Sequence, residues 1–434
     1  MDVPHAVTPA TSASSLCFIS KELILQEGHF AMKRLDPGTS LCAALLAGLV
    51  LCVLMAEALG GEVCYETLGC FTDDKPYSGT PQRPKAALPW TPKKIGARFL
   101  LFTPENPTKH QVIRADSIAS IESSNFKTTR KTCIIIHGMA DKAEDSWVSK
   151  MCNEIVTMDD VNCIGVDWRR GSGNIAIYVQ AANNARLVGA VVAHFLKIIQ
   201  ENINSSYSGS SIHLIGHSLG AHAAGETGKR YSGIWKITAL VDILACNHLR
   251  AIHYYTASIR HPGGFLAYPC DSYKAFKEGS CFPCPAPGCP LMGYFSNSSH
   301  SVTSPQSYYL HTSTKLNGHP SWRYKLSVTL RGTSGIQGAL QAVVHSEEGV
   351  VEECDALTGD FFPGNIYSSF LDVGFEVISV TRVTFSWSLS HFNLFQHTLG
   401  AARIDFQRGR DGNISSFCTD GTVPEHVIQT LLPC

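Results

Sequence analysis

The sequence predicts an α/β domain followed by a β-sandwich. In the first part of the chain, short apolar runs of strand length alternate with longer segments of helical periodicity, which is typical of a largely parallel sheet covered by helices. After about Ser321, strand-like runs follow one another without intervening helices, which is typical of a sandwich. Turn signals at Asn317-Gly318 and Pro320 separate the two patterns, so we expect the domain boundary there, between residues 319 and 320.

The individual elements follow from these patterns. Four apolar runs of the first domain predict buried strands, at Ala97–Phe102, Cys133–Ile136, Ile164–Val166 and Ile212–Ile215. The clearest helix is expected at Ala181–Ile203, where apolar residues recur at helical spacing. The strands expected in the second domain are Trp322–Leu330, Ala339–His345, Gly374–Ile378 and Val380–Trp387.

Composition narrows the functional classes. The chain has 434 residues and a formal net charge of −1, and this balance gives no reason to expect a nucleic-acid partner. Its 16 cysteines indicate an oxidising compartment. Cys281 and Cys284 form a CxxC pair that resembles half of a zinc site, but no second pair accompanies them. A disulfide framework is therefore favoured over a metal protein.

The N-terminal region predicts secretion. Residues 32–61 combine a basic start at Met32-Lys33-Arg34, an apolar run over 41–55 and small residues after it, which is typical of a signal peptide. A membrane anchor is the alternative, but the run is shorter than the roughly 20 residues of a bilayer span. Residues 1–31 are polar and without clear period, and we expect a disordered upstream extension. We expect the secreted protein to begin near residue 62.

The sequence Gly216-His217-Ser218-Leu219-Gly220 has the GxSxG pattern of a nucleophilic serine. Alone this pattern is weak, but the predicted strand Ile212–Ile215 precedes it directly and a predicted helix, Ala221–Arg230, follows it. Strand, tight turn and helix are the setting that a nucleophile elbow requires. We therefore predict that Ser218 is the nucleophile of an ester hydrolase; a buried turn serine is the alternative.

The rest of such a site also has candidates. An oxyanion hole needs two backbone N–H donors, and we expect Leu219 to supply one and Met139, in the loop after Cys133–Ile136, to supply the other. The general base should be a histidine downstream of the serine. His248 is the best candidate, and His253 and His261 are alternatives.

Several runs of the chain resemble the pancreatic lipase family over residues 62–434. They are Glu62–Phe71, Ala87–Trp90, Ile135–Gly138, Asn162–Trp168, Gly216–His222, Ala245–Arg250, Ala267–Cys270, Cys281–Pro285 and Trp322–Tyr324. The resemblance implies an α/β-hydrolase domain over 62–319 and a PLAT/C2-like sandwich over 320–434 that contacts lipid and the small protein colipase. It makes Ser218 the nucleophile and His248 the base, with Met139 and Leu219 as oxyanion donors.

The resemblance also implies a substrate class and covalent features. It implies acylglycerols as substrates, with phospholipids and galactolipids as further candidates. Together with local spacing it implies five disulfides, Cys64–Cys70, Cys152–Cys163, Cys270–Cys281, Cys284–Cys289 and Cys418–Cys434. Separately, the sequons at Asn204, Asn297 and Asn413 are candidate glycosylation sites.

One segment departs from the family pattern. Val241 stands where the family has its catalytic acid, and only nine residues separate Thr238 from His248. The block that carries the acid, a core strand, the calcium loop and the lid is missing, as in an isoform that lacks one coding segment. Asp242 is a weak candidate for a substitute acid. We expect no cofactor and no calcium site, and two functions remain: a serine ester hydrolase, or a catalytically impaired protein that binds lipid or colipase.

Overall fold

The computed structural model describes most of the chain after the predicted signal peptide. The described residues are 61–434, except 82, 86, 242–244, 297–305, 313–319, 348, 351–356 and 391–396. The predicted extension and signal peptide, apart from Gly61, therefore lie outside the described residues, as do Asp242 and Asn297.

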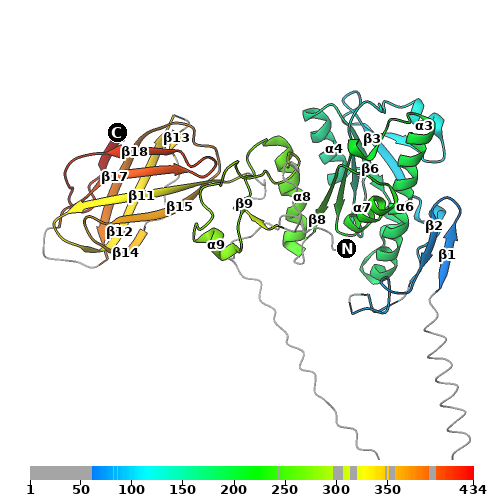
Figure 1. Ribbon diagram of the computed structural model, residues 1–434, viewed down its shortest axis with the longest axis horizontal. Coiled ribbons are helices and arrows are strands. Elements are labelled where there is room, and N and C mark those ends of the chain that lie inside the picture. Colours follow the sequence, from blue (N-terminus) through cyan, green and yellow to red (C-terminus); the bar gives the residue numbers. More distant parts are fainter. Residues whose placement is uncertain are drawn as a thin grey trace, which may run out of the picture. The chain divides into compact units, whose positions relative to one another are not determined.

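The chain divides into two compact units between Ala239 and Leu240. Each unit is described by itself (Figure 1). This division comes earlier in the chain than the turn signals at Asn317 and Pro320. The domain boundary at residues 319 and 320 stays a prediction.

The first unit is built around a six-stranded mixed sheet with the order β4-β3-β6-β5-β7-β8. Its elements are β1 (Glu62–Tyr65), β2 (Gly69–Thr72), α2 (Pro92–Ile95), β3 (Arg98–Phe102), β4 (Gln111–Ile113), α3 (Ile118–Glu122), β5 (Thr132–Ile136), α4 (Trp147–Met158), β6 (Asn162–Asp167), α5 (Arg169–Ser172), α6 (Tyr178–Asn202), β7 (Ile212–His217), α7 (Leu219–Arg230) and β8 (Lys236–Leu240). β5 pairs in parallel with β6 and β7, whereas β3 pairs antiparallel with β4 and β6.

The two faces of this sheet pack against different helices (Figure 1). Every residue of β5, β6 and β7 is buried, as expected of strands covered on both faces. Ile134 and Ile164 join one apolar cluster with the buried residues of α6 and α7. A side chain on Gly165 would meet Val148 of α4 instead, because successive residues of a strand face opposite sides. The predicted α/β fold is confirmed.

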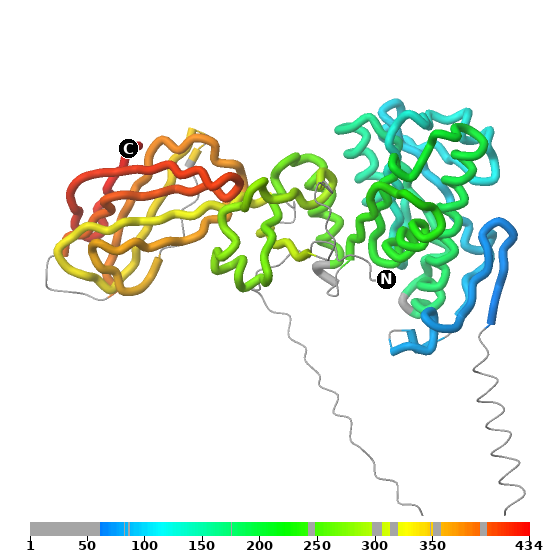
Figure 2. Tube along the Cα trace, in the orientation of Figure 1, coloured from blue at the N-terminus to red at the C-terminus, as the bar shows by residue number. Residues whose placement is uncertain are grey.

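The second unit contains a β-sandwich, drawn from yellow to red in Figure 2. Its strands are β11 (Trp322–Gly332), β12 (Ile336–Ser346), β13 (Gly349–Val350), β14 (Leu357–Phe361), β15 (Ile366–Val373), β16 (Val380–Leu389), β17 (Leu399–Arg408), β18 (Ile414–Cys418) and β19 (Gln429–Pro433). All their pairings are antiparallel, and the main path is β13-β12-β16-β19-β18-β17-β11-β15, with β14 paired to β12. Alternate residues such as Leu326 and Val328 point into one buried core, so the predicted sandwich is confirmed.

One predicted strand of the sandwich is wrong. Gly374–Ile378 forms a loop after the end of β15. Val377 in this loop is buried, which gave the segment its strand-like apolar pattern, but its N–H donates to the hydroxyl of Tyr324 at 2.7 Å instead of to a neighbouring strand. Ile378, which follows it, is 71% exposed.

Between Leu240 and the sandwich lie α8 (Ala245–Arg260), β9 (Tyr268–Pro269), α9 (Tyr273–Lys277) and β10 (Tyr308–Tyr309). Two small apolar clusters, one around Phe265 and one around Phe276, hold this segment together. Within the described part of the chain, no helix is both long and apolar enough to cross a bilayer.

Candidate active site

Ser218 occupies a sharp turn at the carboxyl edge of the sheet. It lies between the end of β7 and the start of α7, and its backbone has φ 56° and ψ −122°. A positive φ is uncommon for a residue with a side chain, and such strained residues cluster at functional sites. Ser218 precedes α7 directly without capping it through its hydroxyl, and the residue is half-buried. The hydroxyl of Ser218 therefore makes no capping hydrogen bond to α7.

The two glycines that flank Ser218 permit this turn. A Cβ atom at Gly216 would lie 2.4 Å from the carbonyl oxygen of Gly220, so the start of α7 folds back onto the end of β7. A Cβ atom at Gly220 would lie 2.0 Å from the carbonyl oxygen of Ile136, so the first turn of α7 also packs directly on β5. Only glycine fits these close approaches between backbone segments.

The loop after β5 lies against Ser218. Because β5 and β7 are parallel neighbours, with Ile136 opposite Gly216, their carboxyl ends open at the same edge. A Cβ atom at Gly138 would lie 2.7 Å from the Cβ of Ser218, which shows how closely the loop approaches. Among the described residues, the N–H of Met139, which follows, donates no hydrogen bond.

Leu219 supplies the second backbone amide beside the serine. It is the first residue of α7, so its N–H has no acceptor within the helix. The helix N-terminus also favours negative charge nearby. The geometry thus brings together a serine hydroxyl and the two backbone segments that sequence reasoning selected as oxyanion donors.

His137 is a buried residue of this loop that the sequence analysis did not single out. Its side chain is fully buried, and its ring stacks on the indole of Trp168 with 5.4 Å between ring centroids. Its Nδ1 lies 2.9 Å from the carbonyl oxygen of Gly138, and the N–H of Trp168 donates to its Nε2 at 3.0 Å. The indole N–H of Trp168 also donates to the carbonyl oxygen of His137 at 2.9 Å.

A buried charge network lies behind His137. Asp167, at the end of β6, has a side chain only 1% exposed, and Arg98 approaches it to 2.6 Å and Arg169 to 2.9 Å. Burial alone would raise the pKa of this carboxyl, but its neighbours, His137 and the two arginines, outweigh burial and hold the pKa well below its usual range. Glu144 bridges the same arginines at 2.9 and 2.7 Å. In the sequence, Asp167 was marked only as a polar residue at the end of a buried strand, within the family-like run Asn162–Trp168.

The candidate bases belong to the second unit. His248 and His253 lie on α8, where His248 is half-buried and His253 is exposed, and His261 directly follows that helix. Ser218 belongs to the first unit, so no single unit brings serine and base together. The pairing of Ser218 with His248 therefore stays a prediction, as does the role of Asp242, which lies outside the described residues.

Among the residues that the structure describes there are five disulfides. They are Cys64–Cys70, Cys152–Cys163, Cys270–Cys281, Cys284–Cys289 and Cys418–Cys434. Cys133 on β5 is a buried thiol outside these pairs. Two candidate glycosylation sites are described: Asn413 is exposed, whereas the side chain of half-buried Asn204 donates to the hydroxyl of Thr128 at 3.0 Å.

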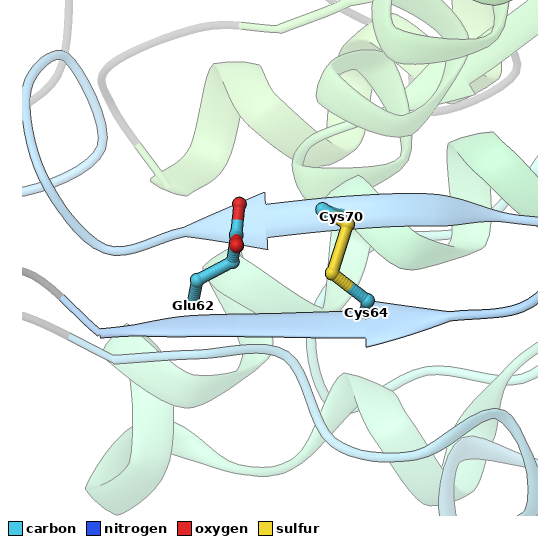
Figure 3. Close-up of side chains that lie close together, drawn as sticks. All are labelled: Glu62, Cys64 and Cys70. Carbon is cyan, nitrogen blue, oxygen red and sulfur yellow. A yellow bond between two sulfur atoms is a disulfide. The ribbon is translucent and has the colours of Figure 1, made fainter.

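One cluster of potential metal ligands occurs among the described residues. It consists of Glu62, Cys64 and Cys70, on the hairpin β1–β2 (Figure 3). The two cysteines form a disulfide, so their sulfur atoms are not thiolates and cannot bind a metal as such. One exposed carboxylate remains, which does not make a calcium site, because calcium takes six to eight oxygen ligands.

Fold and site together define a class. A sheet with a strand–serine–helix turn at its carboxyl edge, beside a loop from a neighbouring parallel strand, is the architecture of the α/β-hydrolases. A family model described as Lipase matches residues 61–243 and 232–317. The chain belongs to the lipase family.

Its relatives in this family are pancreatic lipase-related proteins. The chain is 38% identical over 463 residues to the inactive pancreatic lipase-related protein 1 of Mus musculus, with 88% of this chain and 97% of that protein covered. It is 37% identical over 465 residues to pancreatic lipase-related protein 2 of Homo sapiens, with 88% and 98% covered. It is 39% identical over 438 residues to pancreatic lipase-related protein 2 of Cavia porcellus, with 86% and 100% covered.

The same comparisons reveal a gap in this chain. The alignment with the mouse protein has 463 positions, but 88% of 434 residues is only about 382, so about 80 positions are empty here. The family model matches in two pieces that meet and overlap at residues 232–243. This is the junction where the sequence analysis expects a missing block, between Thr238 and His248.

Proposed function

We propose that this protein is a serine ester hydrolase in which Ser218 attacks the carbonyl carbon of a lipid ester. The observation that carries the proposal is the strained turn: Ser218 has a positive φ between β7 and α7, and Gly138 packs against its Cβ. The N–H groups of Met139 and Leu219 are the proposed donors to the oxyanion that forms on attack. Such donors typically contribute about 10²–10³ in turnover each.

In this proposal His248 is the general base. It takes the hydroxyl proton of Ser218 during attack and then gives it to the leaving alcohol, after which water releases the fatty acid. Asp242 is the candidate for the acid that orients His248. No metal or organic cofactor takes part in these steps.

The proposed substrates are acylglycerols, with phospholipids and galactolipids as further candidates, at the lipid–water interface outside the cell. This assignment rests on family membership, as does the proposed docking of colipase to the sandwich. The five disulfides support secretion. Since the lid belongs to the missing block, we expect soluble short-chain esters to be hydrolysed without a jump in rate when micelles form; such a jump would contradict an open site.

A fluorophosphonate probe tests the proposal on the secreted protein. We expect covalent labelling of the wild type that maps to Ser218 and disappears in Ser218→Ala, but persists in Ser210→Ala, an exposed serine of the same unit. Folding of each variant is checked by circular dichroism. A folded wild type that is not labelled, or labelling that survives in Ser218→Ala, would refute the proposal.

The same probe tests the base. General-base catalysis contributes about 10²–10⁴ in rate, so His248→Gln should slow labelling of Ser218 by about that factor. His253→Gln is the matched control, because His253 is exposed on the same helix. Equal slowing by both variants, or by neither, would remove His248 from the mechanism.

The second candidate function is that of a catalytically impaired protein that binds lipid or colipase. Two observations favour it: the gap at residues 232–243, and a relative whose name marks it as inactive. This function predicts a folded, secreted protein that is not labelled at Ser218 but sediments with lipid vesicles. Labelling at Ser218 together with ester turnover would exclude it.

A further inference from the structure

His137 has a defined hydrogen-bonding arrangement that fixes its tautomer. The backbone N–H of Trp168 lies 3.0 Å from Nε2 and can only donate, so Nε2 must carry the lone pair. In a neutral imidazole the proton is then on Nδ1, which lies 2.9 Å from the carbonyl oxygen of Gly138. His137 therefore donates from Nδ1 to this carbonyl. Oδ1 of Asp167 lies farther from Nε2, at 3.7 Å, so the N–H of Trp168 is the nearer partner of this nitrogen.

The carbonyl of Gly138 and the N–H of Met139 belong to one peptide plane. In a trans peptide these two groups point to opposite edges of the plane. A donor that holds the Gly138 carbonyl on the side of His137 therefore directs the Met139 N–H away from His137. The same loop packs against the Cβ of Ser218 through Gly138. The orientation of this peptide plane therefore decides whether the Met139 N–H points toward the serine.

We propose that His137 is a positioning residue: its Nδ1–H fixes the Gly138–Met139 peptide so that the Met139 N–H faces the oxyanion formed on attack by Ser218. This inference rests on the proposed function. The ring is itself held rigidly, since Trp168 stacks on it and bonds both its Nε2 and its backbone carbonyl. Because such a donor is already oriented before the reaction, no free energy is spent on reorienting it as the oxyanion forms.

Two substitutions separate positioning from mere support. His137→Leu removes the donor, whereas His137→Asn keeps an N–H near the position of Nδ1. We expect the limiting rate of inactivation by a fluorophosphonate to fall about 10²–10³-fold in the leucine variant, with the half-saturating probe concentration unchanged. The asparagine variant should recover most of that loss. His213→Asn is the control, because His213 is equally buried, on β7, and bonds Thr238 instead; it should leave the limiting rate unchanged.

A second readout does not depend on activity. In protein labelled with ¹⁵N-histidine, the imidazole signal lost in His137→Asn identifies His137, and its nitrogen shifts report which nitrogen carries the proton. We expect the Nδ1–H tautomer. The Nε2–H tautomer, or equal limiting rates in wild type and both folded His137 variants, would overturn the inference. If the folded wild type is not labelled at Ser218, the proposed function is refuted. The inferred direction of the Met139 N–H toward an oxyanion is then refuted as well. In that case the tautomer of His137 shows only whether its ring holds the Gly138 carbonyl.

Discussion

The close packing of α7 on β5 makes a sharp prediction for Gly220→Ala. The added Cβ would lie 2.0 Å from the carbonyl oxygen of Ile136 and 2.6 Å from that of His137. Both partners are backbone atoms, so no side-chain rotation relieves the overlap, and helix or strand must move. Overpacking of this kind costs typically 1–3 kcal/mol and occasionally more, and the higher helix propensity of alanine offsets only about 1 kcal/mol. From the upper end of this range we expect a net destabilisation of about 2 kcal/mol.

Gly225→Ala is the matched control on the same helix. No atom lies within 4 Å of the position of its Cβ, so alanine should stabilise α7 by about 1 kcal/mol. Thermal unfolding followed by circular dichroism measures both effects. For a unit of this size, 1 kcal/mol corresponds to roughly 2–4 °C. The midpoint should therefore fall by roughly 4–8 °C in Gly220→Ala and rise by roughly 2–4 °C in Gly225→Ala. Equal midpoints for the two variants would refute the packing deduced for the elbow.

Two further predictions concern the second unit. Burial raises the pKa of Asp372 to about 6, although Arg323 opposes the shift. A carboxyl with a raised pKa in the folded state contributes its full stabilisation below its unfolded pKa near 4. It loses that contribution as the pH rises through 6. Because the side chain of Asp372 is 26% exposed, solvent screening reduces this effect; the stability of Asp372→Asn relative to wild type should thus increase by about 1 kcal/mol between pH 4 and pH 7 in urea titrations, and a constant difference would contradict the burial effect. Replacing Cys418 and Cys434 by serine opens a disulfide with a sequence separation of 16 and should lower the free energy of unfolding by about 3 kcal/mol; unchanged stability would show that the unfolded chain is not constrained there.

Much of the fold could be predicted because its signals are local. β5 and β7 are apolar runs, and helix α6 begins only three residues before the predicted Ala181–Ile203. The loop at Gly374–Ile378 was misassigned because the backbone N–H of buried Val377 donates to the hydroxyl of Tyr324, a residue 53 positions away that no local pattern reveals. Strand β17 was missed because it is held by β11, far away in the sequence, and its own residues include glycine and alanine.

The site divides in the same way. Ser218 and its glycines form a local pattern, so sequence alone located the elbow. His137 and Trp168 are 31 residues apart, and their contact arises only when β5 and β6 pair in parallel, which no local pattern records. His248 is a different case: its selection depended on family resemblance, and it lies in another compact unit than Ser218.

The gap affects the two parts of the proposed site, the oxyanion donors and the proton-transfer residues, to different extents. The residues proposed to stabilise charge all lie in the first unit, because the Ser218 turn, the Met139 loop and His137 precede residue 232. The half that moves the proton depends on residues after the gap. In the serine-protease template, the oxyanion hole and binding alone leave about 10³–10⁴ of catalysis over water when a triad member is removed. We therefore expect slow labelling of Ser218 even if His248 proves idle, and the dependence of that rate on His137 and His248 will show which half still operates.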